Sequence, residues 1–353
     1  MVKSIDLKYL IAYLAPLLAA LGILWAGWWS YGAAILSFVV LPLYELIKPP
    51  TGANLSPTER NARSVSRYYD WLLYSHVPLL FILIAGSIYR VSFTHLETWE
   101  LVGLVLSMGV TLGTFGINVA HELGHRSTAY EQAMAKLLLL PNLYMHFIVE
   151  HNRGHHRYVS TPLDPATARY GENLYFFWIR STVTGYFSAW RIEAERLVKA
   201  GKKVISVQNQ MIVFTLLQLT YLALIFALCG PTGFFFAVAI AVMGFLLLES
   251  INYVEHYGLV RKMTGQGRYE KVTEMHSWES NHDLGRIFLY ELTRHAHHHS
   301  KASVKYQLLD HTPDSPQMPT GYPGMIIMAL IPPLFYWVVN PRVPAEMKAL
   351  AIH

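Results

Sequence analysis

Clustered histidines are the residues of this chain best suited to chemistry. The sequence holds 17 histidines, and four groups of them stand out. These groups are His121-Glu122-Leu123-Gly124-His125, Glu150-His151-Asn152-Arg153-Gly154-His155-His156, the segment 252–258 around His256, and Arg294-His295-Ala296-His297-His298-His299. Imidazole is a ligand for Zn, Cu, Fe and Ni, so histidines at this density predict a metal site.

The spacing within each group indicates which histidines can share a metal. Residues i and i+4 of a helix lie on one face, so His121 and His125 can reach one ion. His151 and His155 have the same spacing, and His156 lies about 100° further round the helix. Two adjacent histidines of this kind can serve two neighbouring metals. The last group repeats the pattern with i, i+3 and i+4 spacing.

The number of candidate ligands predicts two metal ions, because it exceeds what one ion accepts. The nine candidates are His121, His125, His151, His155, His156, His256, His295, His298 and His299. Structural zinc sites mostly use four ligands that include cysteine, and catalytic zinc sites use three protein ligands and an open position. Nine histidines fit neither pattern.

Four carboxylates near these groups can accept hydrogen bonds from the imidazoles and fix their tautomers. Any of them could instead bind or bridge the metals. They are Glu122, Glu150, Asp164 and Glu255. We expect ordinary structural roles for the histidines outside the groups, with His276 left open. Those histidines are His76, His95, His146, His282, His311 and His353.

The elements that position these residues are predicted to be membrane helices. Hydrophobic residues make up 53% of the 353 residues and charged residues only 14%, against roughly 25% charged in a soluble domain. The sequence therefore predicts an all-α integral membrane protein with 1–353 as a single domain. Six windows approach or exceed the roughly 20 apolar residues that a span needs: about 7–29, 31–47, 71–90, 100–120, 207–229 and 232–252. Segments 134–149 and 322–339 are expected to be interfacial or re-entrant.

The distribution of basic residues predicts the orientation of the six spans. Of the 28 Lys and Arg residues, all but Arg90 fall at the termini or in loops on one side. The positive-inside rule places this side, with both termini and the segments 121–206 and 253–353, in the cytoplasm. The net charge of +5 is therefore interpreted as loop bias and not as nucleic-acid binding. The amino terminus is expected to be a retained span and not a removed signal.

The four histidine groups, in this order, resemble the membrane-bound histidine-box superfamily of desaturases, hydroxylases and alkane 1-monooxygenases. The detailed sequences of the motifs are similar to those of the alkane 1-monooxygenase branch. The segments that carry this resemblance are HELGHR at 121–126, EHNRGHHRYVSTPLDPA at 150–166, NYVEHYGLVR at 252–261, SWESN at 277–281, ELTRHAHHHS at 291–300 and PQMPTGYPGM at 316–325. The resemblance covers nearly the whole chain.

The resemblance implies an enzyme with six transmembrane helices and two non-haem iron ions on the cytoplasmic side, held by the nine histidines named above. It implies terminal hydroxylation of n-alkanes to 1-alkanols in a bacterial inner membrane, with electrons from rubredoxin and rubredoxin reductase. Cys229 is the only cysteine, so an iron–sulfur or rubredoxin-type carrier must be a separate chain. The chain departs from the family at His297, where the family usually has Asp, and His297 is left out of the ligand set.

Three other functions are compatible with parts of the pattern. A desaturase or hydroxylase of fatty acyl, sterol or aromatic methyl substrates would use the same histidines. HELGH is also an HExxH motif, in which Glu122 would be the general base of a membrane zinc metalloprotease, but such a site leaves the other groups without a role. A non-catalytic metal transporter would need histidines and carboxylates at mid-membrane depth, whereas these groups lie at and beyond span ends.

Overall fold

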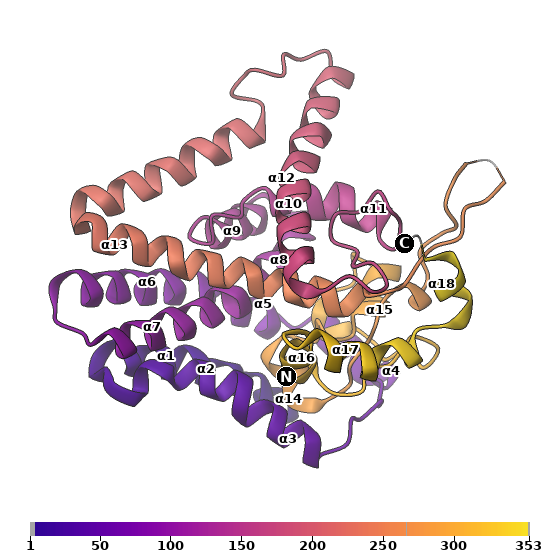
Figure 1. Ribbon diagram of the computed structural model, residues 1–353, viewed down its shortest axis with the longest axis horizontal. Coiled ribbons are helices and arrows are strands. Elements are labelled where there is room, and N and C mark those ends of the chain that lie inside the picture. Colours follow the sequence, from indigo (N-terminus) through magenta and orange to yellow (C-terminus); the bar gives the residue numbers. More distant parts are fainter. Residues whose placement is uncertain (1–3, 266, 352–353) are drawn as a thin grey trace. The chain divides into compact units, whose positions relative to one another are not determined.

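Helices make up the regular structure of the chain. The computed structural model describes residues 4–265 and 267–351, so Lys3 and His353 lie outside the described residues. Within these ranges the only β-pairings are two isolated bridges, Met263 with Tyr269 and Glu279 with Gln317. The α-helices are α1 (Leu14–Trp25), α2 (Gly32–Ile35), α3 (Leu41–Ile47), α4 (Pro57–Ser64), α5 (Tyr68–Tyr74), α6 (His76–Phe93), α7 (Thr98–Thr111), α8 (Asn118–Gly124), α9 (Ala129–Leu139), α10 (Phe147–Glu150), α11 (His156–Tyr158), α12 (Leu174–Lys199), α13 (Gln210–His256), α14 (Asp283–Phe288), α15 (His295–Ser300), α16 (Tyr322–Ala329), α17 (Pro332–Val339) and α18 (Ala345–Leu350) (Figure 1). The predicted all-α class is confirmed.

Shorter helical turns connect several of these elements. Some have the tighter 3₁₀ geometry, at Ser4–Tyr13, Gly27–Tyr31, Glu274–His276, Tyr306–Leu308 and Asn340–Arg342. Others are wider π-helical turns, at Leu36–Val40, Leu112–Ile117 and His151–His155. A π-turn adds a residue to the helical repeat, so it changes which side chains share a face.

The described residues form two compact units. Unit 1 contains the residues up to Val40, Ser66–Val149 and Ala189–Leu248, and unit 2 contains Leu41–Val65, Glu150–Ser188 and the residues from Glu249 onward. Both α12 and α13 contribute residues to each unit. The prediction of a single domain stays a prediction.

Five helical segments of the described chain are long and apolar enough to cross a membrane. They are Asp6–Trp25, Gly27–Ile47, Tyr68–Phe93, Thr98–Gly124 and Gln210–His256. Large apolar side chains on these segments are exposed, such as Leu24, Trp28 and Leu228, which fits a surface covered by lipid. The segments 134–149 and 322–339 are not among the five, and each is divided between separate short helices.

The predicted spans 207–229 and 232–252 both lie in α13, whose 47 residues are interrupted at Gly230. Gly230 has φ 66° and ψ −170°, a conformation that glycine adopts without the steric cost of a Cβ atom. Pro231 then begins the second arm with its ring in place of an N–H donor. Figure 1 shows the chain reversing direction at this bend. The helix is therefore two arms joined at Gly230 and Pro231, between the two predicted spans.

Glycines allow close helix contacts in unit 1. A Cβ atom on Gly109 of α7 would lie 2.3 Å from Cβ of Met243 in the second arm of α13. A Cβ atom on Gly103, which precedes Gly109 in α7, would lie 2.6 Å from the ring of Tyr31. Small residues at crossings let membrane helices approach closely and gain van der Waals contact. α7, which leads to the first histidine pair, is held in this way.

Candidate metal centre

The histidines of the segment 150–156, in unit 2, lie on and beside a π-helical turn. The turn covers His151–His155 and continues into α11 at His156. Because a π-turn brings residues five apart together, Nε2 of His151 lies 2.9 Å from Nε2 of His156. The sequence-based pairing of His151 with His155, which assumed α-helical spacing, is therefore wrong.

Four buried histidines of unit 2 converge on one point. They are His155, His256, His295 and His299, and one nitrogen from each lies within 4.8 Å of the others. Nε2 of His299 lies 2.8 Å from Nε2 of His295 and 3.2 Å from Nε2 of His155. His295 and His299 are four residues apart on α15, so they share a face as predicted.

Three further histidines of unit 2 form a second group beside the first. Their ligand nitrogens also lie within 4.8 Å of one another, and they are His151, His156 and His298. The two groups divide adjacent residues between them: His155 and His156 separate, and so do His298 and His299. The ring centroids of His156 and His299, which belong to different groups, are 4.6 Å apart. This is the arrangement expected of neighbouring sites that share two helical turns.

The donor set fits metal ions and not a purely protein network. Nε2 of His256 is buried and has no hydrogen-bond partner within the described residues, which is costly unless a ligand uses it. Burial, followed by repulsion from His295 and the other neighbouring rings, lowers the pKa of His299 well below its ordinary value. Neutral imidazole is the form that binds a metal.

Asp164 holds His155 in a defined tautomer. Its Oδ2 lies 2.9 Å from Nδ1 of His155 and accepts a hydrogen bond from the Thr167 hydroxyl, and its Oδ1 accepts one from the Ala166 N–H. Burial alone would raise the pKa of Asp164, but attraction to His155 and these hydrogen bonds lower it. With Nδ1–H donated to a carboxylate, Nε2 of His155 is left to face the other three rings.

Two other partners orient imidazoles in unit 2. Nδ1 of His256 lies 3.2 Å from the carbonyl oxygen of His276, so the backbone fixes this ring. The hydroxyl of Tyr322 donates to Oε1 of Glu255 at 2.7 Å, and Oε2 of Glu255 lies 3.2 Å from Nε2 of His295. Glu255 therefore faces the same nitrogen of His295 that faces His299.

The remaining two candidate carboxylates have other contacts. In unit 2, Oε1 of Glu150 lies 3.5 Å from the hydroxyl of Ser188. In unit 1, Glu122 accepts a hydrogen bond of 2.7 Å from Arg126, which also pairs with Asp70. An acidic residue committed to an arginine in this way is a poor general base.

The first histidine pair lies at the end of α8 in unit 1. His121 is the fourth residue of α8 and His125 caps its carboxyl end. Their Nε2 atoms lie 3.3 Å apart, so the predicted pairing at i and i+4 is confirmed. The helix leading to them contains the π-helical turn Leu112–Ile117, which adjusts the direction of the last two turns.

Comparison with known proteins decides the family. A family model described as fatty acid desaturase matches residues 97–327. The chain is 39% identical over 343 residues to alkane 1-monooxygenase 2 of Pseudomonas aeruginosa, covering 93% of this chain and 90% of that protein. It is 37% identical over 319 residues to alkane 1-monooxygenase of Pseudomonas putida, covering 90% and 79%. The chain belongs to the alkane 1-monooxygenases of the fatty acid desaturase family.

A more distant relative has a related printed activity. The hydroxylase component XylM of xylene/toluene monooxygenase from Pseudomonas putida is 29% identical over 335 residues, or 93% of this chain and 86% of that protein. The relatives are monooxygenases, and the chain is accordingly an oxidoreductase. Together with the five apolar segments, membership of this family identifies an integral membrane protein.

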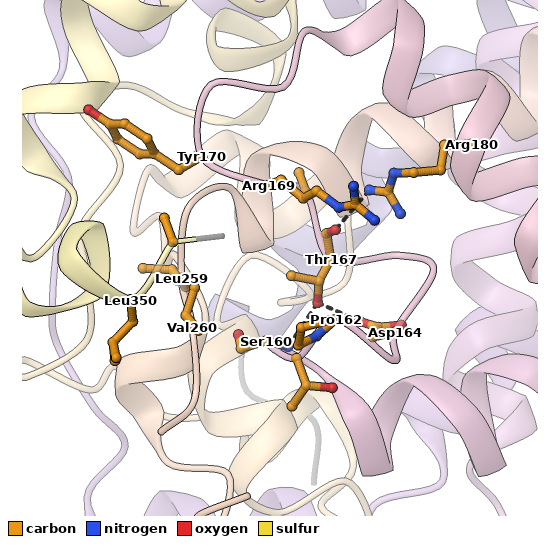
Figure 2. A pocket seen from close by; sticks show the side chains of 13 residues that line it. Ser160, Pro162, Asp164, Thr167, Arg169, Tyr170, Arg180, Leu259, Val260 and Leu350 are labelled. Carbon is orange, nitrogen blue, oxygen red and sulfur yellow. Dashed lines mark hydrogen bonds between the residues drawn. The ribbon is translucent and has the colours of Figure 1, made fainter. Parts of the chain in front are cut away.

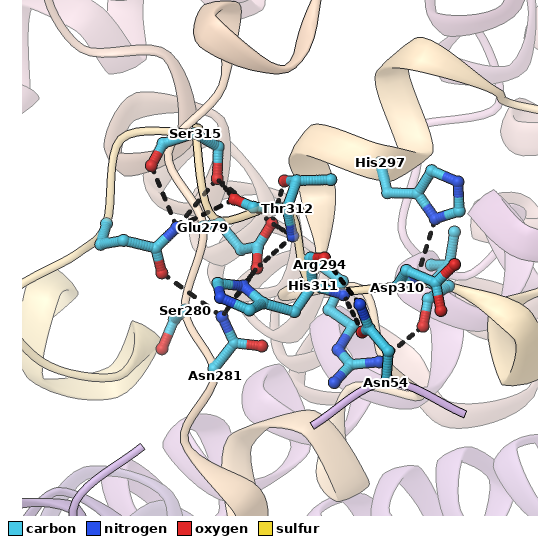
Figure 3. A network of polar contacts seen from close by, with 12 residues as sticks. Asn54, Glu279, Ser280, Asn281, Arg294, His297, Asp310, His311, Thr312 and Ser315 are labelled. Carbon is cyan, nitrogen blue, oxygen red and sulfur yellow. Dashed lines mark hydrogen bonds and ion pairs between the residues drawn. The ribbon is translucent and has the colours of Figure 1, made fainter. Parts of the chain in front are cut away.

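His297 lies outside both histidine groups. Its Nδ1 accepts a hydrogen bond of 2.8 Å from the backbone N–H of Asp310 (Figure 3). Asp310 in turn pairs with Arg60. His297 therefore fastens the segment after α15, which agrees with its omission from the predicted ligand set.

Glu279 was not predicted as a site residue, yet this buried carboxylate organises one side of unit 2. It accepts hydrogen bonds from Asn281 at 2.7 Å and from the hydroxyl of Thr312 at 2.6 Å, and it lies 2.5 Å from Nδ1 of His311 (Figure 3). SWESN matched the family by its sequence, but two partners of Glu279, His311 and Thr312, are more than 30 residues away. Only a contact between distant segments reveals the role.

The backbone around Glu279 joins the elements that carry histidines. The N–H of Trp278 donates to the carbonyl of Glu255 at 2.8 Å, one residue before His256. The N–H of Ser280 donates to the carbonyl of Thr293 at 3.0 Å, two residues before α15. The segment Ser277–Asn281 therefore sets the end of α13 and the start of α15 relative to each other.

The remaining histidines lie outside the groups. His76 is buried between Tyr13 and Phe115, with ring centroids 4.7 and 4.9 Å away. His276 lies 3.4 Å from Glu270 and joins neither group. The others have structural surroundings as expected: His95 contacts Glu97, His146 contacts Tyr144, His282 contacts Ser280 and His311 contacts Glu279. His353 lies outside the described residues.

Proposed function

We propose that this chain hydroxylates the terminal carbon of n-alkanes to give 1-alkanols at two non-haem iron ions. The reaction takes one alkane, one dioxygen, two electrons and two protons to one alkanol and one water. The observation that carries the proposal is the division of seven histidines of unit 2 into two adjoining groups. Alkane 1-monooxygenase is also the printed activity of the relatives at 37–40% identity.

Nine histidines are proposed as the iron ligands. Seven of them are the two groups of unit 2, and the other two are His121 and His125 of unit 1. Imidazole suits iron but does not select it over zinc or copper. The family membership favours iron, and the number of ligands favours two ions over one.

The residues around the histidines would keep the ligands in place and neutral. Asp164 accepts a hydrogen bond from Nδ1–H of His155, and the carbonyl of His276 accepts one from Nδ1–H of His256. Burial keeps His299 neutral and keeps bulk water from the reaction site. Bound iron supplies the reduction of dioxygen and the oxidation of an unactivated C–H bond.

Substrate and electrons are proposed to arrive from different sides. An n-alkane partitions into the bilayer and would enter between the apolar spans. Electrons would come from rubredoxin and its reductase as separate chains, since Cys229 alone cannot hold such a centre. We further propose six spans, with α13 counted as two, both termini in the cytoplasm, and a bacterial inner membrane.

Product analysis tests this proposal. Purified iron-loaded enzyme would be given rubredoxin, its reductase, NADH and a series of n-alkanes under ¹⁸O₂, and the products separated by gas chromatography–mass spectrometry. We expect 1-alkanols that carry one ¹⁸O atom. Metal analysis of the same sample should give two irons per chain.

Oxidation of aromatic methyl groups is the second candidate, favoured by the similarity to XylM over 335 residues. The same assay with xylene or toluene decides between them. Two irons with oxidation of aromatic, acyl or sterol substrates and no alkanol would refute the alkane proposal alone. Zinc without iron would refute the diiron site and favour a metalloprotease.

A further inference from the structure

A pocket of about 160 Å³ lies beside the group of His155, His256, His295 and His299, wholly within unit 2. The loop that follows α11 forms most of the pocket wall. The segments after α13 and at the end of α18 close the pocket. Figure 2 shows Leu259, Val260 and Leu350 on one side and the polar residues of the loop on the other. No ligand that we have assigned to this enzyme uses this pocket.

The wall of the pocket includes Asp164, the residue that holds His155. Its side chain is almost fully buried, and one hydrogen bond of 2.9 Å separates its carboxylate from the imidazole of His155. The wall of the pocket is therefore one carboxylate and one hydrogen bond away from a proposed iron ligand. This short connection is what an electron-entry point needs.

The rim of the pocket is cationic. Arg180 is already used, because it pairs with Glu172 at 2.7 Å and donates to the carbonyls of Pro165 and Thr167. Arg169 is exposed, and its guanidinium has no acidic partner among the described residues. Within the described part of the chain, the only acidic side chain that lines the pocket is the buried Asp164. The free positive charge at the rim is therefore complementary to an acidic surface.

We propose that this pocket is the docking site of an acidic one-electron carrier protein, with Arg169 as its main electrostatic contact. The proposal rests on the proposed function, because it assumes a hydroxylase that receives electrons from a separate chain. In each encounter the reduced carrier loses one electron and the enzyme gains one. Two encounters supply the two electrons that one turnover consumes.

Complementary rim charges mainly increase the association rate of such complexes, and salt screens them. Electron-transfer encounters also have small interfaces, so a single charge can contribute measurably to carrier binding. Reversing the charge of Arg169 should therefore weaken carrier binding and reduce its dependence on salt. It should leave the oxidation of substrate unaffected once the electrons have been supplied.

The test uses the iron-loaded enzyme in phosphatidylcholine nanodiscs and a bacterial rubredoxin as the probe. Arg169→Glu, Arg169→Lys and the control Arg191→Glu would be compared with wild type; Arg191 is an exposed residue of α12 outside the pocket. Two readouts are the dissociation constant of oxidised rubredoxin and the rate at which reduced rubredoxin is reoxidised. A third readout is product per enzyme in a single turnover after chemical reduction with dithionite.

We expect Arg169→Glu to raise the dissociation constant by about fivefold at low salt, with little difference from wild type at high salt. Arg169→Lys and Arg191→Glu should bind as wild type, and the dithionite-driven turnover should be equal in all four proteins. Unchanged binding in Arg169→Glu would overturn the docking site, and so would a loss of dithionite-driven turnover. An effect seen only when the nanodiscs contain phosphatidylglycerol would identify a lipid site instead.

This outcome is separable from the proposed function. Binding and reoxidation of rubredoxin are measured without any product. If wild type binds rubredoxin at the pocket but forms no alkanol, the substrate assignment fails and the docking site stands. If alkanol forms and Arg169→Glu binds normally, the reverse holds.

Discussion

At the residue scale, the arrangement of the histidines depends on which neighbour fixes each ring. His155 is held by Asp164, and His256 by the carbonyl of His276. In both, Nδ1 is used by the protein and Nε2 is directed into the histidine group. The partner of His155 is a charged carboxylate and the partner of His256 is a neutral carbonyl. A carboxylate increases the basicity of an imidazole more than a carbonyl does.

The charge of Asp164 should matter for metal affinity. Asp164→Asn keeps an oxygen that can accept from His155 but removes the negative charge, so we expect iron affinity to fall by about 10- to 100-fold. Competition with a ferrous chelator measures this. Asp314→Asn is the control, because Asp314 is exposed and outside both groups. Equal affinities for the two variants would show that only the hydrogen bond matters.

His297 and His298 are adjacent but should differ sharply. His298 belongs to a histidine group, whereas His297 accepts a hydrogen bond from the backbone of Asp310. We therefore expect His297→Ala to retain two irons per chain and His298→Ala to lose iron, as measured by plasma mass spectrometry. His297→Asp should also retain both ions, since a carboxylate can accept the same backbone hydrogen bond. Loss of iron from His297→Ala equal to that from His298→Ala would contradict this division.

At the element scale, the sequence predicted where helices occur, but it did not predict which turns within them are π-helical. The pairing of His121 with His125 followed from α-helical spacing and is confirmed. The pairing of His151 with His156 did not, because nothing in the local sequence marks the turn His151–His155 as π-helical. The contacts of Glu279 and Tyr322 were missed because they join segments far apart in the chain. The ligand roles of the nine histidines stay predictions.

The bend in α13 depends on one backbone conformation. Gly230 has φ 66° and ψ −170°, so Gly230→Ala should lower the free energy of unfolding by about 1 kcal/mol and the melting temperature by about 2 °C. Differential scanning fluorimetry in detergent measures the shift. Gly185→Ala is the control, since its new Cβ would meet nothing closer than Pro165 at 3.9 Å. An unchanged melting temperature for Gly230→Ala would show that the bend tolerates a side chain.

At the scale of the whole molecule, the histidines of unit 2 connect segments that are distant in the sequence. His155 ends the π-helical turn His151–His155, His256 ends α13, and His295 and His299 lie on α15. The hydrogen bonds of Glu279 and its neighbours join some of these segments directly. Metal ions held by the histidines would add further connections, which exist only in the folded state.

Metal removal should therefore lower the stability of the protein. A ligand that binds only the folded state stabilises it by about 4 kcal/mol at a thousandfold excess over its dissociation constant. We expect the chelator-treated protein to melt several degrees below the iron-loaded protein, and ferrous iron to restore the difference. Magnesium should not restore it, because imidazole is a poor ligand for that ion. Identical melting curves with and without iron would contradict a metal site that connects these segments.

The bend at Gly230 also places the single thiol of this chain. Cys229 ends the first arm of α13, and the second arm runs from Pro231 to His256. At 1.5 Å per residue this arm is about 39 Å long, more than the roughly 30 Å of a bilayer core. If the arm crosses the membrane, a maleimide that cannot permeate lipid will reach Cys229 only from the side opposite His256. The unmodified protein thus contains its own reporter of membrane topology.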